Sequence, residues 1–113
     1  MGAPIFEVRI TQDAEHDLEG IYNFIASEQS LASADKFFDA LSVKVSSLET
    51  FPLRGAFPSE LSVFGIDEFR QILFGTYRIV YSVVEGIVYV HIIADARRDM
   101  QALLERRLLT AKT

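Results

Sequence analysis

The sequence predicts an α+β fold that runs β-α-α-β-β-β-α, and two observations predict it. Apolar side chains recur at helical spacing between Ala14 and Leu48. Between residues 68 and 94, by contrast, three short runs rich in β-branched and aromatic residues are separated by glycine turns. We therefore expect a four-stranded, mainly antiparallel sheet that is packed by an N-terminal helical hairpin and followed by a C-terminal helix.

The first elements are a short strand and two amphipathic helices. "PIFEVRIT" (4–11) alternates polar and apolar residues, and Thr11 is suited to cap the helix that follows. The apolar stripe of that helix is Ala14, Leu18, Ile21, Tyr22 and Ile25. After the break "SEQS", a second helix carries on one face Ala34, Phe37, Phe38, Leu41, Val45 and Leu48. Helices joined by so short a link are expected to form an antiparallel hairpin.

The second half of the chain supplies the remaining strands and the last helix. "FPLRGAFPSE" (51–60) contains two prolines and a glycine and is expected to be a loop. The strands are "EFRQILF", "TYRIVYSVV" and "GIVYVHIIA", with tight turns at Gly75 and at Glu85–Gly86. "RRDMQALLERRLL" (97–109) then has the apolar spacing of a helix.

Length and composition indicate one globular domain over residues 1–113, half of whose residues are hydrophobic. The chain has no cysteine, which excludes disulfides and thiol catalysis and fits a cytoplasmic location. No apolar run approaches the ~18 residues of a membrane span, so no membrane partner is expected.

Charge is distributed unevenly. Residues 1–53 carry three basic and nine acidic side chains, a balance of −6, whereas residues 54–113 carry eight and seven, a balance of +1. The total of −5 argues against strong direct binding to nucleic acid. Seven of the eight basic residues in the second half are arginine, so an anion-binding site is expected there.

Four of these arginines are candidates for a functional patch. Arg78 lies on the strand face opposite Tyr77, Ile79 and Tyr81, and is either paired with a nearby carboxylate or part of a working site. Arg97 and Arg98 are expected at the start of the last helix, where cations oppose the helix dipole. Arg70, in the preceding strand, is expected to project toward the same region.

Signatures of catalysis are sparse. The histidines are His16 and His91, and neither has a second ligand at metal spacing. The chain has no glycine-rich nucleotide loop. We therefore assign no catalytic residue, and expect neither a cofactor nor a metal site.

The helical hairpin contains more large apolar residues than its interior needs. These residues are Ile21, Phe24, Ile25, Phe37 and Phe38. Surplus apolar surface on a small domain is typical of a partner groove, so these five residues are candidates for binding a partner segment.

Three motifs in this order resemble the RelE/ParE superfamily of type II toxin–antitoxin toxins. They are "FPLRG" after the hairpin, "EFRQILFGTYRIVYSV", and "VHIIADARRDMQALLERRLL". The resemblance covers nearly the whole chain, and the arginine–aspartate start of the last helix is similar to the ParE branch. It implies that the partner at the apolar surface is a ParD-like antitoxin.

The two branches imply different functions. RelE-type toxins cut ribosome-bound mRNA with a cluster of Lys, Arg and a late Tyr. Arg78 and Arg97 match two of those arginines and Arg70 one lysine, but Ile72 and Leu103 occupy the other lysine and the tyrosine positions. ParE-type toxins poison DNA gyrase by binding. The resemblance therefore favours a gyrase poison over an enzyme, with an mRNA endonuclease or a non-toxic antitoxin-binding homologue as alternatives.

Overall fold

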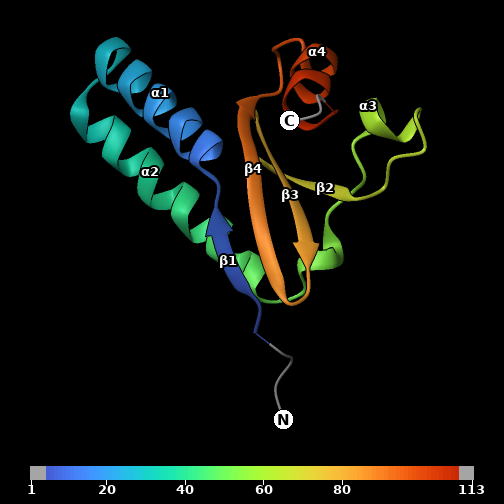
Figure 1. Ribbon diagram of the computed structural model, residues 1–113. Helices are drawn as coiled ribbons and strands as arrows, with labels where there is room; N and C mark the ends of the chain where they lie inside the picture. Colours follow the sequence, from blue (N-terminus) through green and yellow to red (C-terminus); the bar gives the residue numbers. More distant parts are fainter. Residues whose placement is uncertain (1–4, 110–113) are drawn as a thin grey trace.

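Residues 5–109, which this computed structural model describes, form a four-stranded mixed sheet with helices on both faces (Figure 1). The strand order is β1-β4-β3-β2. β1 (Glu7–Ile10) is parallel to β4 (Ile87–Asp95), whereas β3 (Tyr77–Val84) is antiparallel to both β4 and β2 (Phe69–Phe74). The predicted fold class and element order are confirmed, and Pro4 of the expected first strand lies outside the described residues.

Two-residue turns set the register of the antiparallel strands. Gly75, in the β2–β3 turn, has φ 59°, and Glu85 and Gly86, between β3 and β4, have φ 50° and 82°. A turn with positive φ at both central residues, as at Glu85 and Gly86, has a twist that matches that of paired strands, and so does a turn with positive φ at the first central residue alone, as at Gly75. The predicted hairpins are therefore confirmed. A β-bulge interrupts the β3–β4 pairing next to Val80, where His91 is the extra residue.

The helical hairpin of α1 (Gln12–Glu28) and α2 (Leu31–Ser46), followed by a 3₁₀ turn at Ser47–Glu49, covers one face of the sheet (Figure 1). Thr11 caps α1 as expected, and its hydroxyl accepts a hydrogen bond from the Ala14 N–H. The two helices and the sheet enclose a buried cluster, here called core one: Ala14, Leu41, Val45, Leu48, Ile72, Ile79, Tyr81, Val88, Val90 and Ile93. The predicted stripes thus face the sheet, although Phe38 remains exposed.

Short helices cover the opposite face. They are α3 (Ser59–Ser62) and α4 (Met100–Leu104), which a π-helical turn extends over Glu105–Leu109. Between these helices and the sheet lies core two: Leu61, Val80, Ile92, Ala94, Met100, Leu103 and Leu104.

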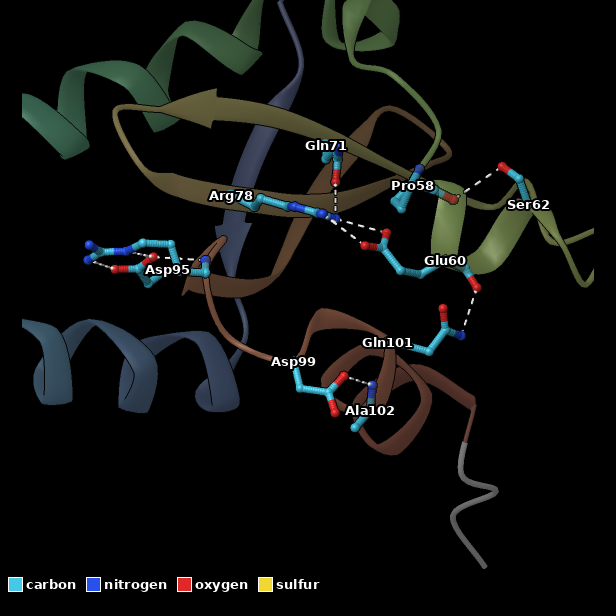
Figure 2. Close-up of polar contacts among 10 residues, drawn as sticks. Pro58, Glu60, Ser62, Gln71, Arg78, Asp95, Asp99, Gln101 and Ala102 are labelled. Atoms are coloured by element: carbon cyan, nitrogen blue, oxygen red, sulfur yellow. Dashed lines mark hydrogen bonds and ion pairs between the residues drawn. The ribbon is translucent and has the colours of Figure 1, made fainter.

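The boundaries of this side differ from those predicted. The segment 51–60 is not all loop, because it contains a 3₁₀ turn at Pro52–Arg54 and the start of α3. The last helix begins at Met100, not at Arg97, because Asp99 is its N-cap and accepts a hydrogen bond from the Ala102 N–H (Figure 2).

Candidate functional site

The four candidate arginines do not form one patch. Arg70 pairs with Tyr81 in the register of β2 and β3, whereas Arg78 pairs with Leu73. Because neighbouring positions in a strand point to opposite faces, Arg70 lies on the face of core one and Arg78 on the face of core two. The prediction that Arg70 projects toward Arg78 is therefore wrong.

Arg70 holds the loop that runs beside the edge strand β2, where Ala56 pairs with Gln71. Its Nη1 donates to the carbonyl oxygens of Leu53 (2.8 Å) and Gly55 (2.9 Å), and its guanidinium lies 4.4 Å from the centre of the Phe57 ring. The same loop is fixed from core one, since the Tyr81 hydroxyl donates to the Pro52 carbonyl at 2.5 Å. The contacts of the Arg70 guanidinium therefore hold this loop in place.

Arg78 connects β3 to α3 (Figure 2). Its guanidinium donates to both carboxylate oxygens of Glu60, at 2.9 and 2.8 Å, and to the side-chain oxygen of Gln71 at 3.1 Å. The two ionic side chains are 17% and 15% exposed, and the hydrogen bonds from Arg78 lower the pKa of the Glu60 carboxyl. Gln101 of α4 in turn donates to the Glu60 carbonyl. Of the two alternatives for Arg78, the structure therefore shows the ion pair.

Arg97 and Arg98 lie in the turn before α4 and differ from each other. Arg97, whose side chain is 78% exposed, binds both carboxylate oxygens of Asp95, and these bonds lower the pKa of Asp95 to about 2. The exposed guanidinium of Arg98 makes no hydrogen bond or ion pair with any residue in the described part of the chain. Arg98 is therefore the candidate that remains available to a partner.

A fifth arginine, Arg107, makes a poorly exposed ion pair that the sequence analysis did not predict. It donates to both carboxylate oxygens of Asp17 at 3.1 Å and to the His91 carbonyl at 2.8 Å. Asp17 also accepts the Ile93 N–H at 3.0 Å. A signal was present, because Asp17 follows Ala14 by three residues and so lies beside the buried stripe of α1, where a carboxylate needs a partner.

The two histidines differ in burial. His91 is half-buried beside Phe69 and within 2.8 Å of the Ser82 hydroxyl, and burial, followed by the charge of Arg107, lowers its pKa. His16 is exposed on α1. Within residues 5–109 no group of three or more His, Asp or Glu side chains is placed to bind a metal ion.

The five apolar candidates for partner binding divide into two sets. Ile25 is 8% exposed, and Phe37 packs against the rings of Phe74 and Tyr77, so these two belong to the interior. Phe24 is 64% exposed, and Phe38 and Ile21 are partly accessible.

The accessible residues lie in two hollows on opposite sides of α1. The acidic groove, of about 680 Å³, is lined by the carboxylates of Glu15, Glu19 and Asp35 and by residues that include Leu18, Tyr22 and Phe38. The arginine groove, of about 520 Å³, is lined by residues that include Gly20, Ile21, Phe24, Tyr77, Asp95 and Arg98. The structure therefore brings Arg98 into the same hollow as two of the apolar candidates.

None of the helices in the described part of the chain has the length and apolar content needed to span a bilayer. The fold is similar to that of a solved structure from P. aeruginosa, described as a chromosomal ParDE TA system. That structure is 19% identical in sequence, the match covers 82% of this chain and 98% of the other, and the TM-score is 0.70. A comparison with curated protein sequences finds no match. Residues 8–100 match the family described as "ParE toxin of type II toxin-antitoxin system, parDE", and the chain belongs to this family.

Proposed function

We propose that this toxin acts by binding and poisoning DNA gyrase, and that a cognate ParD-like antitoxin neutralises it. The observation that carries the proposal, beyond the family match, is that Glu60 occupies both terminal nitrogens of the Arg78 guanidinium and Gln71 binds one of them as well. An arginine whose terminal nitrogens are bound in this way is not free to form paired hydrogen bonds with a phosphate.

The same geometry argues against an mRNA endonuclease. Cleavage of RNA needs cations and a proton-transfer group that converge on one phosphate. Arg70 and Arg78 lie on opposite faces of the sheet, and Ile72 and Leu103, at the positions of the second lysine and the tyrosine in RelE-type toxins, are buried in core one and core two. The arrangement supports action through a binding surface, in the bacterial cytoplasm where gyrase works.

The test is to express the protein alone in bacteria and to add it to purified gyrase and plasmid DNA. We expect filamentation, an SOS response and gyrase-dependent cleavage complexes while translation continues at first. The matched control is the same toxin preincubated with the product of the adjoining antitoxin gene, which should abolish all three.

Two results contradict the proposal. Ribosome-bound mRNA that is cut within minutes while DNA stays intact would establish the endonuclease. Unimpaired growth, together with tight antitoxin binding, would identify a homologue that has lost its toxicity.

A further inference from the structure

We infer that the arginine groove is the docking site for an acidic segment of the antitoxin, which places a carboxylate on Arg98 and an adjacent apolar side chain beside Gly20, Ile21 and Phe24. The inference rests on the antitoxin partnership proposed above and adds to it the position and the chemistry of one contact.

The charge of the arginine groove favours an acidic segment as its occupant. Two carboxylates line the groove, but Asp17 is bound by Arg107 and Asp95 by Arg97. The guanidinium of Arg98 has no partner among residues 5–109, so the unpaired charge in the groove is positive. Arginine binds a carboxylate through two parallel hydrogen bonds, which combine strength with a defined orientation.

Gly20 lines the arginine groove and, because it has no side chain, leaves part of the groove open. It lies in the middle of α1, where glycine costs about 0.5–1 kcal/mol relative to alanine, and its φ is not positive, so the backbone does not require it. A Cβ at this position has no heavy atom within 4 Å. The missing side chain leaves open surface next to Phe24, where an apolar side chain of the partner can pack.

The two grooves beside α1 discriminate between segments. The acidic groove is lined by the carboxylates of Glu15, Glu19 and Asp35 and repels a segment that carries carboxylates. A segment that is both acidic and apolar is therefore directed to the side of α1 that carries Arg98.

The experiment measures dissociation constants between the full-length toxin and the product of the adjoining antitoxin gene. We expect Arg98→Ala to weaken binding about tenfold or more and Arg98→Glu about a hundredfold, since the first substitution removes the positive charge and the second reverses it. Gly20→Leu, which fills the groove without disfavouring the helix, should also weaken binding about tenfold. A charge-reversed antitoxin, with one acidic residue changed to lysine, should restore binding to Arg98→Glu.

Matched controls lie outside the groove. Arg106→Ala removes another exposed arginine, and Ala40→Leu adds the same side chain to an exposed site on α2; each should stay within about twofold of the wild type.

The outcomes separate the two proposals. A wild-type toxin that does not bind the antitoxin overturns the partnership itself. Tight wild-type binding that Arg98→Glu and Gly20→Leu leave unchanged overturns only the docking site. If these variants keep antitoxin affinity but lose cleavage complexes with gyrase, the groove serves the target, and the inference is equally wrong.

Discussion

The two faces of the sheet are covered in different ways. On the side of core one, α1 and α2 span 17 and 16 residues and pack through apolar side chains. On the side of core two, α3 and α4 span four and five residues, and arginine ion pairs accompany a smaller apolar cluster. The difference shows that short helices, which bury little apolar surface, are positioned here by directional polar contacts.

The physical reason is the cost of forming a short helix. Isolated helices of fewer than about 12 residues are marginal in water, so α3 and α4 depend on tertiary contacts. Arg78 joins α3 to β3 through Glu60, and Arg107 joins the end of the α4 segment to α1 through Asp17. Arg78, which the sequence analysis assigned to a functional patch, and Arg107 therefore both stabilise the fold.

The largest expected effect comes from Arg107→Ala. The substitution leaves the poorly exposed Asp17 carboxylate with the Ile93 N–H as its only partner among residues 5–109, and it removes the bond to the His91 carbonyl. We expect the free energy of unfolding to fall by about 3 kcal/mol, measured by chemical denaturation. Amide exchange should accelerate in residues 100–109 more than in α1 and α2.

The control for this variant is Arg106→Ala, an exposed neighbour, with an expected change of less than about 0.5 kcal/mol. Equal effects of the two substitutions would mean that the pair of Arg107 and Asp17 does not hold the C-terminal segment.

Arg78→Ala should have the next largest effect, about 2 kcal/mol, because it leaves the poorly exposed Glu60 carboxylate without its partner. Arg78→Lys keeps the charge but loses the fork of parallel hydrogen bonds, so about half of the loss should remain. If Arg78→Ala abolished toxicity while the denaturation curve stayed unchanged, Arg78 would belong to the working surface instead.

The stability gap between wild type and Arg78→Ala should also depend on pH. The pKa of Glu60 is lowered in the folded protein, so the ion pair contributes stability above the unfolded pKa of about 4.3 and loses it as pH falls through the lower folded value. Denaturation curves recorded between pH 6 and pH 3 should therefore converge. A gap of constant size would exclude Glu60 as the partner that matters.

Arg97→Ala should have the smallest effect on stability, because the side chain is mostly in solvent and its pair with Asp95 is screened. We expect an unchanged melting temperature. Reduced toxicity in this variant would therefore report a contact with the target, not a loss of folding, and a lowered melting temperature would contradict this assignment.

The sequence by itself determined the fold class, the two long helices and the hairpin turns. Those features depend on local periodicity and on glycine backbone freedom, as at Gly75 and Gly86. The turn at Gly75 also implied the register that separates Arg70 from Arg78, because a two-residue loop places Phe74 opposite Tyr77. The buried position of Tyr81 followed from the alternation along its strand.

Only the tertiary structure decided the partners of the arginines. Glu60 is 18 residues from Arg78, and Asp17 is 90 residues from Arg107, and no local pattern connects such pairs. The first residue of α4 could not be predicted from the sequence either. Asp99 is the N-cap, so Arg97 and Arg98 lie in the preceding turn and not in the helix. Whether an arginine is bound or free depends on which carboxylate the packed chain brings within reach, and here it leaves Arg98 open beside Gly20.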